Sequence, residues 1–299
     1  MFAGFSFAGS IPALVTPFAA DGAFDEQAYR DFVEWQIAEG SSALVACGTT
    51  GEAATLSYDE HFHVVRVCVD QAKGRVPVIA GAGSNDTRVA SANLRAAREA
   101  GADAALMVPP YYNRPSQEGI FRHFEALAAD APLPIILYNV PGRTVTDIQP
   151  ATLARVVTAF PQVFVGVKDA SGVLARVSQH REACGPDFCQ LSGNDDLALA
   201  FNVMGGTGCI SVSANVAPKM CSQFQEAMRE GRWDEARTLQ DRLYPLHDAM
   251  FADASPGPAK YALSRVRPDF PTEVRLPMTP PSDAARAIVD AALAHAGLA

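Results

Sequence analysis

Lys168 stands near the end of an apolar run, residues 164–171, and its amine is suited to covalent chemistry. Lysine is almost never fully buried without a partner or a task. Gly166, two residues earlier on the same strand face, is expected to leave space beside it. An uncharged lysine amine attacks a carbonyl carbon and forms a Schiff base. A structural ion pair with Asp169 or another carboxylate is the alternative, and the run itself leaves both open.

The turn GTTGE at residues 48–52 is a second candidate for chemistry. Thr49 and Thr50 place two hydroxyls and successive backbone N–H groups between glycines, an arrangement that can hold a carboxylate. An ordinary strand-to-helix turn, in which a threonine caps the helix, fits the same residues. The turn therefore indicates either an anion site or a simple connection.

Tyrosines and an arginine follow two other apolar runs. A tyrosine hydroxyl can transfer protons when a network holds it, whereas packing is the other explanation for Tyr111, Tyr112 and Tyr138. Arg143 can grip a carboxylate through two N–H groups, although many loop arginines are simply solvated. These side chains form one site only if the fold brings them to Lys168.

Eight short apolar runs supply the elements that would position these residues. The runs are continuously apolar rather than alternating, which is typical of strands covered on both faces of a parallel sheet. Their starts lie 20 to 35 residues apart, close to the size of a βα repeat. The runs are residues 11–18, 43–48, 78–83, 104–111, 134–141, 164–171, 188–194 and 208–215.

The segments between the runs carry helical patterns. Residues 25–39 have one apolar stripe and stop at Gly40, Ser57 and Glu60 form a capping box, and residues 85–100 close on Gly101. Eight strands alternating with helices predict an α/β fold, the (β/α)8 TIM barrel. Its catalytic groups belong at the carboxyl ends of the strands.

The C-terminal part is too long for one closing helix. We expect helices at residues 218–230, 232–249, 255–266 and 282–297, of which the first can be the eighth barrel helix. The sequence thus predicts a catalytic barrel over residues 1–230 and a small C-terminal helical domain over residues 231–299.

The composition excludes several classes of protein. The chain has 299 residues, is 48% hydrophobic and contains 22 Gly and 21 Pro, which excludes a disordered, collagen-like or coiled-coil chain. Its 24 Lys and Arg against 33 Asp and Glu give a net charge of −9, which argues against a nucleic-acid partner.

The location and the cysteines follow from simple patterns. Residues 1–20 are uncharged, but Pro12 and Pro17 interrupt them and no basic residue precedes them. We therefore expect this segment to be neither a signal peptide nor a membrane span. We expect the protein to be cytoplasmic. The six cysteines form no Cys-x-x-Cys pair and are expected to be reduced and mostly buried. His61 and His63 face different ways on a helix, so no metal is expected there.

The constellation of Lys168, the Thr-Thr turn and the tyrosines resembles the pyruvate-dependent Schiff-base aldolase, or N-acetylneuraminate lyase, superfamily. Within it the chain is similar to the dihydrodipicolinate synthase family from about residue 10 to residue 290. Six motifs carry this resemblance: GTTGE at 48–52, PYYNRPSQEG at 110–119, YNVPGRT at 138–144, GVKDASG at 166–172, LSGND at 191–195 and LPMTP at 276–280. It implies a lyase that condenses pyruvate with L-aspartate semialdehyde in lysine and diaminopimelate biosynthesis.

The resemblance also implies roles around pyruvate. Lys168 would form the imine, and Thr50 with neighbouring backbone amides would hold the pyruvate carboxylate. Gly193 and Ile210 would line the pocket. No metal or organic cofactor is expected, because the lysine imine serves as the electron sink.

Further implied roles involve the acceptor and a second subunit. Tyr138, Thr49 and Tyr112 would form a proton relay, with Tyr112 reaching in from a neighbouring subunit of a homotetramer built as a dimer of dimers. Arg143 would bind the carboxylate of aspartate semialdehyde at the mouth of the site.

An effector site for lysine is retained only in part. The resemblance places it at His61, Asn85 and Tyr111, but where lysine-inhibited members carry Ser, His and Glu, this chain has Ala53, Tyr58 and Val89. Loss of the acidic residue removes a partner for the ammonium group of lysine. We therefore expect weak or absent inhibition by lysine.

Three other functions fit the same residues less well. N-acetylneuraminate lyase and the 2-keto-3-deoxy sugar acid aldolases share the lysine, but typically have Ser-Thr in the first turn and lack the arginine. Thr49 and Arg143 therefore favour the synthase. A pyruvate sensor or inert scaffold is disfavoured by retention of the whole set, and a metal-dependent aldolase by the lack of a histidine cluster.

Overall fold

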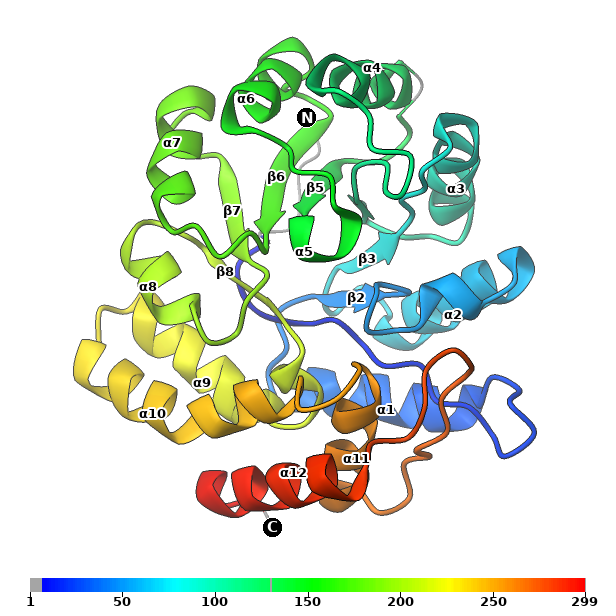
Figure 1. Ribbon diagram of the computed structural model, residues 1–299, viewed down its shortest axis with the longest axis vertical. Helices are drawn as coiled ribbons and strands as arrows, with labels where there is room; N and C mark the ends of the chain where they lie inside the picture. Colours follow the sequence, from blue (N-terminus) through cyan, green and yellow to red (C-terminus); the bar gives the residue numbers. More distant parts are fainter. Residues whose placement is uncertain (1–6, 130, 299) are drawn as a thin grey trace.

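The computed structural model describes residues 7–129 and 131–298 (Figure 1). The first six residues of the uncharged N-terminal segment and the last residue of the expected C-terminal domain lie outside the described residues. Parallel strands form one eight-stranded sheet in the order β1-β8-β7-β6-β5-β4-β3-β2. The strands are β1 Gly9–Pro12, β2 Leu44–Ala46, β3 Val78–Gly81, β4 Ala104–Met107, β5 Ile135–Asn139, β6 Phe164–Asp169, β7 Cys189–Ser192 and β8 Gly208–Ser211.

The sheet closes on itself between β1 and β2. A parallel bridge joins Ala13 to Val45, and the N–H of Leu14 donates to the carbonyl oxygen of Val45 at 2.9 Å. Seen in Figure 1, the strands occupy the centre of the molecule and the helices surround them. The predicted (β/α)8 TIM barrel is confirmed.

The strands are shorter than the apolar runs that predicted them. The run at 104–111 gives only Ala104–Met107, since Pro109 and Pro110 have no N–H to donate to a ladder. The run at 208–215 gives Gly208–Ser211, followed by the 3₁₀ turn η2 Ser213–Asn215. The second half of each of these two runs, which the apolar composition predicted as strand, belongs to the loops at the carboxyl edge of the barrel.

The predicted helix boundaries agree with the structure. Asp25 caps α1 by accepting the N–H of Ala28, and the Ser57–Glu60 capping box is present at the start of α2. The helices are α1 Glu26–Ala38, α2 Tyr58–Ala72, α3 Thr87–Glu99, α4 Gln117–Ala128, α5 Pro141–Thr144, α6 Pro150–Ala159, α7 Ala175–Cys184, α8 Ala198–Val203, α9 Pro218–Arg229, α10 Trp233–Ala249, α11 Gly257–Val266 and α12 Asp283–Ala296, with a further 3₁₀ turn, η1 Ala53–Thr55.

Two layers of apolar side chains make up the core. One layer lies inside the barrel and the other between the strands and the helices. The inner cluster contains one or two side chains from most strands and from the residues that follow them: Ile11, Ala13, Ala43, Val45, Ile79, Ala104, Leu106, Ile136, Tyr138, Val140, Leu191 and Ile210. The barrel is therefore filled, and a ligand has to enter from the edge that the loops form.

The C-terminal helices pack on one side of the barrel. In Figure 1, α10, α11 and α12 lie together beside α1 and α9. Leu243 of α10, Leu263 of α11 and Val289 of α12 are fully buried and belong to the same core cluster as the barrel helices. The division of the chain after residue 230 stays a prediction. None of the helices in the described residues is long and apolar enough to span a bilayer.

Candidate active site

Lys168 lies inside the barrel opposite Tyr138. The two residues are partners in the β5–β6 ladder, and Nζ of Lys168 is 4.1 Å from the centre of the Tyr138 ring. Both side chains are buried. Within the described part of the chain, Nζ of Lys168 forms neither an ion pair nor a hydrogen bond. The amine is thus free to react.

Asp169 does not pair with Lys168. Its Oδ1 accepts the backbone N–H of Ser171 at 2.8 Å and the hydroxyl of the same residue at 2.5 Å. Successive strand residues point to opposite faces, so Asp169 faces the helices while Lys168 faces the barrel interior. The structural ion pair that was the alternative for Lys168 is absent from residues 7–129 and 131–298.

Gly166 serves a different purpose from the one expected. A Cβ built on it would lie 2.8 Å from the carbonyl oxygen of Cys189 and 2.9 Å from its Cβ. The expectation that Gly166 leaves space beside Lys168 is wrong, because β7 fills that volume. The glycine instead permits close contact between β6 and β7.

The turn after β2 is tightly built. Gly51 donates its N–H to the Gly48 carbonyl oxygen and Glu52 donates to that of Thr49, both at 3.1 Å. The carbonyl oxygen of Gly51 accepts the Thr16 hydroxyl at 2.7 Å. Neither threonine caps a helix, since the residue preceding η1 is Glu52 and the cap of α2 is Ser57. The alternative of a threonine-capped helix is therefore wrong.

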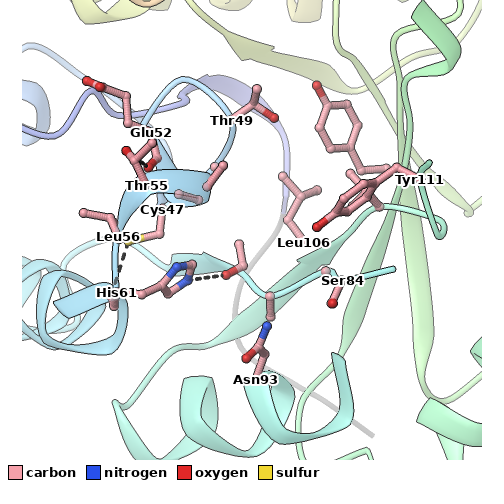
Figure 2. Close-up of a pocket in the computed structure, with 18 of the residues that line it drawn as sticks. Cys47, Thr49, Glu52, Thr55, Leu56, His61, Ser84, Asn93, Leu106 and Tyr111 are labelled. Atoms are coloured by element: carbon pink, nitrogen blue, oxygen red, sulfur yellow. Dashed lines mark hydrogen bonds between the residues drawn. The ribbon is translucent and has the colours of Figure 1, made fainter. Parts of the chain in front are cut away.

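A cavity of about 630 Å³ opens beside this turn (Figure 2). Its lining includes three of the predicted catalytic or substrate-binding residues, Thr49, Tyr138 and Arg143. Arg143 is exposed on the short helix α5, at the outer part of the site. Lys168 does not line the cavity itself but lies against Tyr138, which does. The structure therefore brings the predicted nucleophile, hydroxyls and arginine to one place.

Thr50, Gly193 and Ile210 lie near the cavity without lining it. Thr50 is buried within the turn, and Ile210 belongs to the inner barrel cluster together with Tyr138. The N–H of Gly193 donates to the carbonyl oxygen of Asp169 at 2.7 Å, and a Cβ there would lie 2.6 Å from the Cβ of Ala170. Gly193 is thus fixed directly beside the strand that carries Lys168.

Tyr112 does not line the cavity of its own chain. Its side chain is 90% exposed, and its φ of +71° is in the left-handed region that a bulky residue rarely adopts. Tyr111, the preceding residue, does line the cavity. The structure does not place Tyr112 with Thr49 and Tyr138 within one chain.

Of the three expected effector residues, His61 and Tyr111 line the cavity and Asn85 does not. In Figure 2, His61 and Tyr111 approach the cavity from opposite sides. Nε2 of His61 is 2.7 Å from the carbonyl oxygen of Gly81, and burial lowers the pKa of His61, so this ring is neutral and donates from Nε2. Asn85 does not line the cavity; its carbonyl oxygen accepts the Asn113 amide at 2.9 Å.

Burial disfavours the thiolate form of the cysteines by raising their pKa values. Cys47 lines the cavity, but it is 2% exposed and burial raises its pKa well above the ordinary value. Four of the six cysteines are buried and two are partly exposed, which confirms the expectation of mostly buried thiols. That they are reduced stays a prediction. No group of His, Cys, Asp or Glu side chains suited to a metal ion occurs in the described residues.

Sequence reasoning missed the residues that hold the turn from behind. Glu52, the last residue of GTTGE, received no role, yet its buried carboxylate accepts Nζ of Lys260 at 2.6 Å and the N–H of Arg275 at 3.0 Å. The available signal was Lys260 itself, a lysine within the largely apolar start of the helix at 257–266.

The chain resembles proteins of known name over almost its whole length. The model of the Dihydrodipicolinate synthetase family matches residues 6–296. A 4-hydroxy-tetrahydrodipicolinate synthase of Rhizorhabdus wittichii is 67% identical, over 98% of this chain and 100% of the relative. A pyruvate complex of the dihydrodipicolinate synthase from Acinetobacter baumannii is 41% identical, with a TM-score of 0.94 over 98% of this chain and 100% of that one. A monomeric dihydrodipicolinate synthase variant is 34% identical, with the same TM-score over 98% of each chain.

Proposed function

Because the chain belongs to the dihydrodipicolinate synthetase family, we propose that Lys168 is the nucleophile of its reaction. The activity is that of a 4-hydroxy-tetrahydrodipicolinate synthase, which condenses pyruvate with L-aspartate semialdehyde in lysine and diaminopimelate biosynthesis. The chain is thus a Schiff-base-forming lyase. The relatives' names favour this activity over cleavage of N-acetylneuraminate or of 2-keto-3-deoxy sugar acids.

The observation that carries the role of Lys168 is its buried, unpaired amine against Tyr138. The amine adds to the C2 carbonyl of pyruvate, and loss of water gives the imine. Removal of a proton from C3 gives an enamine, whose C3 attacks the aldehyde carbon of the second substrate, and the aldehyde oxygen takes up a proton. The substrate amine then adds to C2 and displaces Lys168, which leaves as the free amine.

Proton transfers in these steps fall to Tyr138 and Thr49, which line the same cavity. A hydroxyl next to the amine can take the proton that Lys168 loses and return it to the departing water. Tyr112 completes this relay from a neighbouring subunit. Its exposure and its position on a loop beside the cavity support such a contact.

The two substrate carboxylates have separate partners. Thr50 and the backbone amides of its turn hold the carboxylate of pyruvate at the inner end of the site. Arg143 binds the carboxylate of L-aspartate semialdehyde at the outer end, where its exposed guanidinium lines the cavity. Gly193 and Ile210 complete the wall near Lys168.

Self-association follows from the role of Tyr112. A homotetramer made of two dimers, with the tyrosine exchanged within each dimer, would complete every site. The existence of a monomeric variant among the similar structures makes the oligomeric state the point to measure. Location in the cytoplasm stays a prediction.

The test is pyruvate consumption by the purified protein with L-aspartate semialdehyde as acceptor, coupled to a reductase that oxidises its nicotinamide only if the cyclic product forms. Rapid turnover is expected. If pyruvate is trapped on Lys168 by borohydride but no turnover occurs, the nucleophile is retained and the acceptor is wrong, and sugar-acid aldehydes would be tried next.

A further inference from the structure

Glu52 connects the substrate-binding turn to a distant part of the chain. It is the fifth residue of the turn that carries Thr49 and Thr50, and it lines the cavity. Its side chain is 1% exposed, and that of Lys260 on α11 is 0% exposed. Oε1 accepts Nζ of Lys260 at 2.6 Å, and Oε2 accepts the backbone N–H of Arg275 at 3.0 Å. Both donors come from the C-terminal region, more than 200 residues away in the sequence.

Lys260 is itself held from several sides. Its Nζ donates to the carbonyl oxygen of Glu273 at 2.6 Å and lies 4.3 Å from the centre of the Phe18 ring. Burial lowers the pKa of Lys260 to about 8, although the carboxylate of Glu52 favours the charged form. A fully buried ion pair of this kind adds little net stability, because both ions lose their hydration. The presence of this pair is therefore better explained by the position that it gives to Glu52 than by a gain in stability.

The ion pair holds a residue whose backbone conformation closes the turn. Its φ of +55° lies in the left-handed region, and its N–H closes the turn on the carbonyl oxygen of Thr49. The other side of the turn is anchored through Gly51, whose carbonyl oxygen accepts the Thr16 hydroxyl. A shift of the Glu52 carboxylate would therefore move the two threonines relative to the barrel.

Arg275 adds a second connection to the same region. Its guanidinium donates to both carboxylate oxygens of Glu60, at 2.6 and 2.7 Å, and to the carbonyl oxygen of Thr55 at 3.0 Å. The main chain of Arg275 binds Glu52, while its side chain binds the start of α2. The segment after α11 is thus attached to the middle of the connection between β2 and α2 and to the start of α2.

We propose that Lys260 is a positioning residue for pyruvate binding, acting through Glu52 on the Thr49–Thr50 turn, so that the C-terminal helices take part in substrate recognition. The ammonium group also compensates the negative charge of Glu52 at the cavity wall, where an unpaired carboxylate would repel the anionic substrate. This inference rests on the proposed function only in taking pyruvate as the ligand of the turn.

The test compares Lys260→Met with a matched control, Lys219→Met. Lys219 is exposed on α9 and outside the cavity. We expect the pyruvate concentration that half-saturates borohydride trapping to rise about tenfold or more in Lys260→Met, since small displacements of a binding group are costly. The trapping yield at saturating pyruvate stays near that of the unmodified protein, and the control leaves both values unchanged.

A double variant separates positioning from a general loss of structure. Glu52→Gln together with Lys260→Met removes both charges, and the glutamine amide oxygen can still accept the N–H of Arg275. Partial recovery of pyruvate half-saturation in the double variant supports the proposal. A folded Lys260→Met protein with unchanged half-saturation and only a lower melting temperature would overturn it.

Arg275→Met covers the case in which Lys260→Met does not fold. We expect it to raise the half-saturating pyruvate concentration in the same direction, because the segment that holds Glu52 loses its side-chain attachments. An unchanged value in folded Arg275→Met would also overturn the proposal. Because trapping needs no acceptor, failure of turnover with L-aspartate semialdehyde overturns the assigned acceptor alone and leaves the trapping curves to decide on Lys260.

Discussion

Nζ of Lys168 lies 4.1 Å from the centre of the Tyr138 ring, and the two residues are direct partners in the β5–β6 ladder. Tyr138 lines the cavity and Lys168 does not, so the amine is next to the cavity through its contact with the ring. The ladder fixes the two Cα positions side by side, so both side chains start from neighbouring points on the inner face of the barrel. The same pair of strands thus positions the proposed nucleophile and the proposed proton donor.

Replacement of the amine should abolish the covalent route. We expect Lys168→Ala to lower kcat by on the order of 10³-fold or more and to eliminate borohydride trapping of pyruvate, since no other side chain replaces the nucleophile. Mass spectrometry of the borohydride-treated protein measures the adduct. Full turnover in this variant would defeat the Schiff-base assignment, and Lys219→Ala serves as the exposed control.

Removal of the Tyr138 hydroxyl should affect proton transfer more than imine formation. Tyr138→Phe keeps the ring beside Lys168, so we expect kcat to fall by about 10²- to 10⁴-fold while pyruvate can still be trapped. Steady-state kinetics and trapping are measured in parallel. Tyr244→Phe, at an exposed tyrosine of α10, is the control, and an unchanged kcat in Tyr138→Phe would exclude the hydroxyl from the relay.

Loss of the outer arginine should act on the acceptor alone. We expect Arg143→Met to raise the KM for L-aspartate semialdehyde by about 10- to 100-fold, because the variant loses one charge-assisted contact to the substrate carboxylate. Half-saturation by pyruvate should change little, because Arg143 is exposed at the outer end of the cavity. Equal changes for both substrates would contradict separate carboxylate sites. Arg66→Met, on the exposed face of α2, provides the comparison.

Inhibition by lysine should be weak or absent. The cavity contains His61 and Tyr111 but has Tyr58 and Val89, both about half exposed, where a partner for the lysine ammonium group is needed. We expect millimolar lysine to leave the rate nearly unchanged and Val89→Glu to introduce inhibition. Potent inhibition of the unmodified enzyme would contradict this prediction, and Val203→Glu, outside the cavity, tests for unspecific effects of the added charge.

The Asp147–Arg176 ion pair should make part of the stability depend on pH. Arg176 donates to both carboxylate oxygens of Asp147, at 2.7 and 2.6 Å, and these hydrogen bonds lower the pKa of Asp147. A carboxyl whose pKa is lower in the folded state stabilises the protein above its unfolded pKa, about 3.9, and loses this contribution as the pH falls through the folded value. The stabilisation is therefore present at neutral pH and disappears in acid.

Asp147→Asn tests this dependence. We expect it to lower the free energy of unfolding by about 1–3 kcal/mol at pH 7, since Arg176 is left without its charged partner. The difference should shrink below about pH 4, as Asp147 becomes protonated in the unmodified protein. Urea unfolding at several pH values measures it. Glu118→Gln, which breaks an exposed pair with Arg155, should change stability little at any pH, and a pH-independent effect of Asp147→Asn would contradict the assignment.

Local patterns in the sequence were sufficient to predict the barrel and the position of Lys168 in it. Continuous apolar runs of regular spacing give parallel strands, and capping residues such as Ser57 give the helix starts, because both signals depend on neighbours in the chain. They also place Lys168 at the carboxyl end of β6. The same patterns overestimated strand length, because apolar residues such as Val108 and Ala214 also occur in the loops that follow the strands.

The role of Gly166 and the setting of Glu52 were beyond such patterns. A glycine in a strand indicates that a neighbouring group lies close to its Cα. Only the packing of β7 against β6 identifies that group as Cys189. Tyr111 and Tyr112 are adjacent and chemically identical, and both are exposed, yet only Tyr111 lines the cavity. The backbone between them turns through the positive φ of Tyr112.

The sequence by itself determined which residues can react and in which order the strands carry them to one edge of the barrel. Only the tertiary structure decided what holds them there. Lys260 and Arg275 reach Glu52 from the C-terminal helices, across more than 200 residues. A buried ion pair is specified by how two distant elements pack, and no periodicity or motif within either element records its partner.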